Sequence, residues 1–149
     1  MSRVGKKPIT LPKGVEVKVD AGGVHVKGPK GTVSAPILEG ISVAVKDGRV
    51  DLARASEEKR VRAFHGLNRA LVQNAVVGVA EGYRRAIDLV GIGYKAEKKG
   101  NEVIFTCGYS HTVRFPEPAG VTIDVAPDAK AKDVTHIVVT GVDKQKVGE

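Results

Sequence analysis

The stretch Gly28-Pro29-Lys30-Gly31-Thr32-Val33-Ser34-Ala35-Pro36 has a counterpart eighty residues further on, Gly108-Tyr109-Ser110-His111-Thr112-Val113-Arg114-Phe115-Pro116. The same register continues to Gly40 on Gly120 and Val45 on Val125, giving six identities over residues 28–45. The matching positions are mostly turn and strand-face residues, which a β-hairpin constrains most strongly. A repeat of 80 residues is too long for a solenoid, whose periods are roughly 20–50 residues. The sequence therefore predicts one small domain that is used twice.

The first half of the chain has the pattern of several strands followed by one helix. Valine alternates with polar residues over 15–19, and apolar residues alternate again over 41–45, as in half-buried strands. Ser56 is predicted to cap a helix of about 24 residues whose first turn carries Glu57 and Glu58, and Glu81-Gly82 is predicted to end it. The apolar face of this helix is predicted from spacings of three and four, at Val61, Phe64, Leu67, Leu71, Ala75 and Val79.

The second half repeats this order but stops early. Strands are predicted around residues 87–94, 103–105, 113–115, 121–125 and 137–139, with a hairpin turn at Lys98-Lys99-Gly100-Asn101. Asp143 stands where Ser56 stood, as a helix N-cap, and only six residues follow it. We therefore predict an α+β fold of two tandem duplicated units, each an antiparallel sheet covered by one helix, the second helix cut short. The first unit spans residues 1–82 and includes a basic N-terminal arm, and the second spans residues 83–149.

The charge of the chain favours a polyanionic partner. Twenty-four Lys and Arg against 17 Asp and Glu give a net charge of +7, which indicates nucleic acid first and an anionic membrane surface second. The single cysteine excludes an intramolecular disulfide and favours a reducing compartment. No apolar run reaches the roughly 18 residues of a membrane span, and the basic N-terminus lacks the apolar segment of a signal peptide. These features predict a cytoplasmic protein that does not span a membrane.

A glycine- and lysine-rich segment offers the clearest candidate site. Gly91-Ile92-Gly93-Tyr94-Lys95-Ala96 matches the dinucleotide-binding pattern G-x-G-x-x-A, but that pattern needs a helix after the glycines, and here a hairpin turn and a strand follow. The glycines instead indicate a bulge or the close approach of another backbone. With Tyr94, Lys95, Lys98 and Lys99 beside them, that backbone is predicted to be the sugar-phosphate chain of RNA. A solvated basic hairpin tip is the alternative interpretation.

Patterns typical of catalysis or metal binding are incomplete. Gly108-Tyr109-Ser110-His111-Thr112 departs from the nucleophile elbow G-x-S-x-G at its last position, and strand rather than helix follows. Cys107 and His111 are four residues apart without a second Cys–His pair, so no zinc site is predicted. The remaining histidines stand singly and are interpreted as surface or satisfied polar groups. The sequence predicts no enzyme, no cofactor, no metal and no small-molecule substrate.

Several blocks of the sequence together resemble a known family. They are Ser2-Arg3-Val4-Gly5-Lys6-Lys7-Pro8-Ile9, Pro12-Lys13-Gly14-Val15, Lys27-Gly28-Pro29-Lys30-Gly31, Gly78-Val79-Ala80-Glu81-Gly82-Tyr83, Leu89-Val90-Gly91-Ile92-Gly93-Tyr94-Lys95-Ala96, Gly108-Tyr109-Ser110-His111 and Gly141-Val142-Asp143-Lys144-Gln145-Lys146-Val147-Gly148. In this order they are similar to the bacterial-type family of ribosomal protein six of the large subunit, over nearly the whole chain. The resemblance implies a protein without catalytic activity or cofactor that binds large-subunit ribosomal RNA. It also implies a position near the stalk base, where translation-factor GTPases dock, beside neighbouring ribosomal proteins.

The resemblance implies that the RNA contacts lie mainly in the second unit, around Gly91–Lys95 and Gly108–His111. The full candidate set for RNA binding is Arg84, Arg85, Gly91, Gly93, Tyr94, Lys95, Lys98, Lys99, Gly108, Tyr109, Ser110 and His111, with Arg3, Lys6 and Lys7 of the N-terminal arm. The arm has no core to join in the sequence pattern, so it is expected to order only against RNA or a neighbouring protein. The family continues beyond the position of Glu149 with the rest of the last helix and a basic tail, so we expect the second unit to be shortened within its helix.

A second function remains open from the sequence. The duplicated sheets could serve as docking surfaces of a protein–protein adaptor, with the positive charge serving solubility. Salt separates the two hypotheses, because phosphate-driven binding weakens steeply with salt whereas an apolar interface hardly responds.

Overall fold

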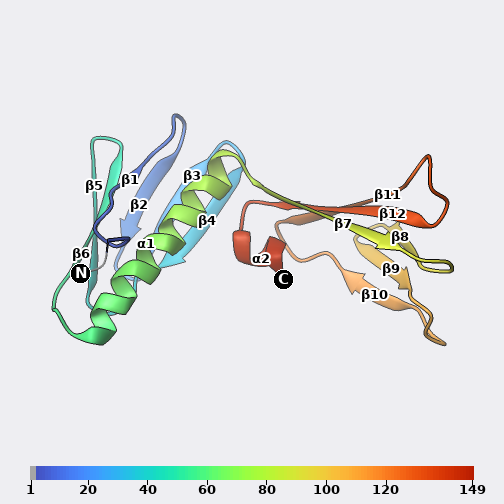
Figure 1. Cartoon of the computed structure of the whole chain (residues 1–149). Coiled ribbons are helices and arrows are strands. Elements are labelled where there is room, and N and C mark those ends of the chain that lie inside the picture. The colour runs from blue at the N-terminus through green and yellow to red at the C-terminus, as the bar shows by residue number, and fades with distance from the viewer. Residues whose placement is uncertain (1–2) are drawn as a thin grey trace. The chain divides into compact units, whose positions relative to one another are not determined.

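The computed structural model describes residues 3–149, so Met1 and Ser2 at the start of the expected basic arm lie outside the described residues. The chain divides into two compact units: unit 1 is Met1–Gly82 with Val142–Lys144, and unit 2 is Tyr83–Gly141 with Gln145–Glu149. In chain order (Figure 1) the elements are β1 (Ile9–Thr10), β2 (Glu16–Asp20), β3 (Gly23–Gly28), β4 (Gly31–Pro36), β5 (Ile41–Lys46), β6 (Arg49–Arg54), α1 (Lys59–Ala80), β7 (Tyr83–Val90), β8 (Lys95–Lys99), β9 (Glu102–Thr106), β10 (Val113–Pro116), β11 (Val121–Pro127), β12 (Val134–Gly141) and α2 (Lys144–Gly148).

The two units share one plan, which confirms the duplicated α+β fold. Unit 1 has the antiparallel sheets β1-β6-β5 and β2-β3-β4, and unit 2 has the corresponding sheets β7-β12-β11 and β8-β9-β10. The eighty-residue register of the sequence places β4 on β10 and β5 on β11. The structure adds that each unit contains two three-stranded sheets where a single sheet was predicted.

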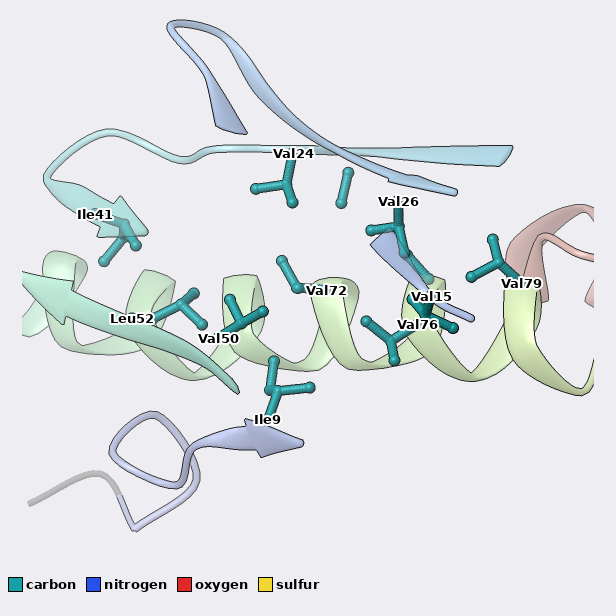
Figure 2. Packing of buried hydrophobic residues seen from close by; sticks show 12 residues of the cluster. Ile9, Val15, Val24, Val26, Ile41, Val50, Leu52, Val72, Val76 and Val79 are labelled. Atoms are coloured by element: carbon teal, nitrogen blue, oxygen red, sulfur yellow. The ribbon is translucent and has the colours of Figure 1, made fainter. Parts of the chain in front are cut away.

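The core of unit 1 is built almost entirely from small aliphatic side chains. Helix α1 packs along β3 and β4, and the sticks in Figure 2 place Val24 and Val26 opposite Val72, Val76 and Val79 of the helix. These five valines are at most 1% exposed. Fully burying a valine stabilises a fold by roughly 1.5–3 kcal/mol, so a chain with no Trp and three Phe can still assemble a core from β-branched residues.

Helix α1 begins later than its sequence predicts. Its first residue is Lys59, and Glu58 occupies the N-cap position without a side-chain capping bond. The predicted cap, Ser56, accepts a bond of 3.4 Å from the Glu58 N–H, so it shapes the preceding turn. Glu57 is held by the Arg54 guanidinium at 2.6 and 2.8 Å, and this bond lowers the pKa of the Glu57 carboxyl. The prediction that Ser56 caps the helix with two acids in the first turn is therefore wrong, because the helix begins at Lys59 and both acids precede it.

The end of α1 is where it was predicted. Glu81 is the C-cap, and the Gly82 N–H donates to the Gly78 carbonyl at 2.9 Å. Gly82 has φ +79°, a left-handed conformation that glycine adopts without a Cβ clash and that commonly ends helices.

The buried face of α1 differs from the predicted apolar stripe. Leu67 is 50% exposed, whereas His65 and Asn68 are buried. The His65 Nε2 donates to the Leu52 carbonyl at 2.9 Å, and the Asn68 side-chain amide donates to the Pro36 carbonyl at 2.6 Å. Each of these side chains bonds a backbone carbonyl beneath the helix, which offsets part of the cost of its burial, although the His65 Nδ1 has no hydrogen-bond partner among the described residues. Apolar spacing alone could not identify them.

The second helix is short, as predicted. Helix α2 has five residues against 22 in α1, and its one buried side chain is Val147. Val147 packs in the core of unit 2 with Val103, Ile123 and Ile137. A Cβ on Gly141 would lie only 2.8 Å from a Val147 methyl group, so the glycine lets the helix reach the sheet.

Candidate nucleic-acid interface

A tight turn joins β7 to β8 in unit 2. The Tyr94 N–H donates to the Gly91 carbonyl at 3.2 Å, and the Gly91 N–H donates to the Asp133 carbonyl at 3.1 Å. Gly93 has φ +81°, and no atom lies within 4 Å of the position that its Cβ would take. The backbone conformation therefore favours glycine at this position, and the absence of a side chain leaves the surface of the turn open. Strand β8 follows directly, so the helix that a dinucleotide-binding fingerprint requires does not form.

The ring of Tyr94 joins the two glycine-bearing segments that the sequence singled out. The ring lies against the Cα of Gly91, where any side chain would collide with it. On the other segment, a Cβ on Gly108 would be 3.5 Å from the Tyr94 Cε1 atom. The turn at residues 91–94 and the loop at residues 107–112 therefore meet at this ring. Tyr94 is 42% exposed, and its ring packs between the turn and the loop.

The loop between β9 and β10 presents aromatic rings to solvent. Gly108 has φ +76°, and the two residues after it, Tyr109 and Ser110, are exposed. Tyr109 is 67% exposed, and its ring stacks on that of His111 with centroids 5.7 Å apart and 26° between the planes.

Two of the three predicted lysines are free to meet an external anion. Lys95 and Lys99 are exposed, and neither forms an ion pair with the part of the chain that the structure describes. Lys99 ends β8, beside the turn at Gly100 and Asn101. These positions suit point-charge contacts to phosphates.

Lys98 has a different environment from Lys99. Its ammonium lies 2.7 Å from the Glu117 carboxylate and 4.0 Å from that of Asp124. Glu117 is 14% exposed in its side chain and also accepts the Ile123 N–H at 3.0 Å. The bond from Lys98, followed by that from Ile123, lowers the pKa of the Glu117 carboxyl. The charge of Lys98 is therefore balanced inside unit 2, which leaves Lys99 as the more available cation at the end of β8.

A groove of about 570 Å³ runs along this surface and includes a lysine that the sequence analysis missed. Its lining residues are Gly91, Gly93, Tyr94, Lys95, Ala96, Glu97, Lys98, Lys99, Val125, Pro127, Lys132, Asp133 and Thr135. Lys132 comes from the loop between β11 and β12, far from the other lysines in sequence. The run Ala129-Lys130-Ala131-Lys132 was the available signal, since alternating small and basic residues in a loop suit phosphate contacts.

His136 links the loop between β11 and β12 to strand β7 through two carboxylates. The His136 Nδ1 lies 2.5 Å from the Asp88 carboxylate of β7, and its Nε2 lies 3.2 Å from the carboxylate of Asp128 in the loop. The bonds to Asp88 and then Asp128 raise the pKa of the His136 ring. The Lys130 N–H, and less strongly His136, lower the pKa of Asp128. The sequence interpretation of His136 as a satisfied polar group is confirmed.

Arg84 and Arg85 lie on β7, the edge strand of its sheet. Both are exposed, but successive residues of a strand point to opposite faces. Arg85 shares the face of Tyr83 and Leu89, which pack on the core of unit 2, and Arg84 lies on the other. Their side chains therefore leave β7 on opposite faces of the sheet.

The N-terminal arm belongs to unit 1. Arg3, Lys6 and Lys7 are exposed, but Gly5 is buried against the His65 ring. The Arg69 Nε also donates to the Lys7 carbonyl at 3.3 Å. The expectation that the arm has no core to join is wrong, because its backbone packs on α1.

Residues 3–149 contain no group of three or more His, Cys, Asp or Glu side chains that could hold a metal ion. None of the helices formed by these residues has the length and apolar character needed to cross a membrane. Unit 2 therefore carries glycine turns, exposed aromatic rings and, among the described residues, lysines outside ion pairs on a duplicated α+β scaffold.

Comparison with known proteins identifies the family. The family described as Ribosomal protein L6 matches residues 11–82 and 90–149. A relative from Koribacter versatilis, "Large ribosomal subunit protein uL6", is 52% identical over 150 aligned residues, covering all of this chain and 80% of the relative. One of the same description from Caldicellulosiruptor saccharolyticus is 47% identical over 148 residues, covering 99% of this chain and 78% of the relative. The chain belongs to the ribosomal protein L6 family, a family of structural proteins, which confirms the resemblance and the prediction that it is not an enzyme.

Proposed function

We propose that this protein is a structural constituent of the large ribosomal subunit and that its principal partner is large-subunit ribosomal RNA. The observation that carries the proposal is family membership over both halves of the chain, with relatives described as large ribosomal subunit proteins. The protein then works in the ribosome, in the cytoplasm, and its contribution is to hold RNA in place.

The RNA-binding surface is the loop cluster of unit 2, which consists of the turn at residues 91–94, the loop at residues 107–112 and the loop between β11 and β12. Gly93 lacks a side chain and has open space around it, so a sugar-phosphate backbone can approach the turn closely. Lys95, Lys99 and Lys132 supply positive charge along the groove, and such contacts fix position without reading sequence. Arg84 or Arg85 extends the surface along β7. Lys98 acts through Glu117 by fixing the end of β8.

The place of the protein in the subunit is the base of the stalk, near the region where translation-factor GTPases dock, beside neighbouring ribosomal proteins. The family resemblance supports this position. The exposed side chains of Arg3, Lys6 and Lys7 give unit 1 a second basic surface, suited to a neighbouring protein or a further RNA segment.

Co-sedimentation tests the proposal. The tagged chain, expressed in bacterial cells, should sediment with large subunits after the lysate is washed at increasing salt, and it should be lost steeply as salt rises. The adaptor hypothesis has its own support, since Ile92 is 89% and Val90 63% exposed beside the same turn. Retention that is insensitive to salt, or capture by protein fractions that lack RNA, would favour the adaptor.

A further inference from the structure

We infer that the loop at Gly108–His111 is a stacking platform that receives one unpaired nucleobase of the bound RNA. Tyr109 provides the stacking ring, His111 supports it, and Tyr94 holds the loop in place. The inference rests on the proposed function and specifies the form of RNA that this site accepts.

The exposure of Tyr109 suggests a partner for its ring. The ring is 67% exposed, and its one aromatic neighbour among residues 3–149 is His111. Ring contact with His111 leaves the opposite face of Tyr109 open. Every nucleobase has a π-face, so an open aromatic ring at an RNA-binding surface accepts a base whatever its sequence.

The platform is built before the RNA arrives. The left-handed Gly108 sets the direction of the loop, and the Tyr94 ring packs beside that glycine. The Tyr109 ring already lies on His111 in the free chain. A loop that is positioned before binding loses less freedom on binding, so more of the stacking free energy appears as affinity.

The two tyrosines have different roles in this arrangement. Tyr94 lies against the backbone of Gly91 and beside Gly108, so it is a positioning residue. Tyr109 lies on His111 and is 67% exposed, so it is the contact residue.

The chemistry of the site favours an unpaired base over a duplex. In A-form RNA the bases are stacked on one another, and the deep major groove excludes side chains, so rings stack only on bases splayed out of loops, bulges and ends. Lys95 pairs in register with Thr106, two residues before Gly108. A phosphate held by Lys95 therefore lies within reach of a nucleotide whose base stacks on Tyr109.

The experiment compares variants of the full chain for binding to large-subunit ribosomal RNA transcribed in vitro. Tyr109→Ala should weaken binding by about 5- to 150-fold, the range for one stacked base. The slope of log affinity against log salt should stay unchanged, because no phosphate contact is lost. Tyr109→Phe should bind with the affinity of the original chain. Tyr109→Leu should bind nearly as weakly as Tyr109→Ala, because it has no ring. Leu67→Ala, which removes an exposed apolar side chain from α1 in unit 1, is the matched control and should bind normally.

Chemical probing of the same complexes identifies the base. One unpaired nucleotide should become protected when the original chain binds and should regain reactivity with Tyr109→Ala. Equal affinity of Tyr109→Ala and the original chain would overturn the inference, as would full binding by Tyr109→Leu. If the original chain does not bind the RNA at all, the proposed function fails. These outcomes are distinguishable because the first two require the original chain to bind.

Discussion

Replacing Lys95 and Lys99 together by glutamine should flatten the salt dependence of RNA binding. Both lysines are exposed on β8 and form no ion pair with the described part of the chain, so each is available for one phosphate. Each phosphate contact contributes about 0.7–0.9 to the slope of log affinity against log salt. The double variant should therefore lose about 1.4–1.8 from that slope.

The magnitude can be expressed as an affinity ratio. Raising salt from about 50 to about 200 mM is a fourfold change, so two lost contacts make the affinity drop about 7- to 12-fold smaller than for the original chain. Filter binding or fluorescence anisotropy over this range, with large-subunit ribosomal RNA as the ligand, measures the slope directly.

Two controls make the result specific. Lys18→Gln with Lys46→Gln removes the same charge from exposed positions on β2 and β5 of unit 1, and the slope should not change. Lys98→Gln should leave the slope intact but lower the thermal stability, because it removes the cation from the largely buried Glu117. An unchanged slope in the β8 double variant, or an equal effect of the unit 1 control, would refute the reasoning.

Three further predictions concern the conformation and stability of the units. Gly93→Val should destabilise unit 2 by about 1–2 kcal/mol, because φ +81° is strained for residues with a Cβ, whereas Gly93→Asn should destabilise it less. Urea unfolding measures both variants, and equal stability of Gly93→Val and the original chain would contradict the account. Gly28→Ala should cost about 1–3 kcal/mol, since its Cβ would lie 2.6 Å from the Val79 carbonyl oxygen, while Gly22→Ala, with nothing within 4 Å, should be close to neutral in the same assay. The ion pairs of His136 with Asp88 and Asp128 should stabilise unit 2 fully below the usual histidine pKa of about 6.5, and this stabilisation should be lost as pH rises through the raised pKa of the ring. The melting temperature of His136→Gln should therefore approach that of the original chain between pH 5 and pH 9. A difference in melting temperature that stays constant over this range would reject the linkage.

The duplication could be predicted from sequence because its signal lies in turn and strand-face residues. Gly28 and Gly108 begin the repeated stretch, yet the structure gives them different reasons to be glycine. Gly28 allows the close approach of α1, and Gly108 has a left-handed backbone. The helix end at Gly82 was also predictable, since it depends on a local conformation. The helix start was not, because Glu58 takes the N-cap position and Glu57 bonds Arg54 ahead of the helix.

Composition predicted the candidate site, and tertiary contacts add detail that the sequence does not carry. Lys98 and Lys99 are neighbours in sequence, and only the folded chain brings Glu117 to one of them. The contact of Tyr94 with Gly108 likewise joins segments 14 residues apart. Lys132 reaches the groove from a loop that carries no glycine or aromatic signal. Such pairings depend on strand register and loop path, which local patterns do not specify.

The central claim, that the loop cluster of unit 2 holds large-subunit ribosomal RNA, is tested most directly by ultraviolet cross-linking in assembled large subunits, followed by mass spectrometry of the cross-linked peptides. The account predicts that nucleotides of large-subunit RNA attach to peptides containing Tyr94–Lys99 and Tyr109. It also predicts that the Tyr109→Ala variant loses the second cross-link and keeps the first. Cross-links confined to unit 1, or RNA-free subunit proteins as the only cross-linked partners, would contradict it.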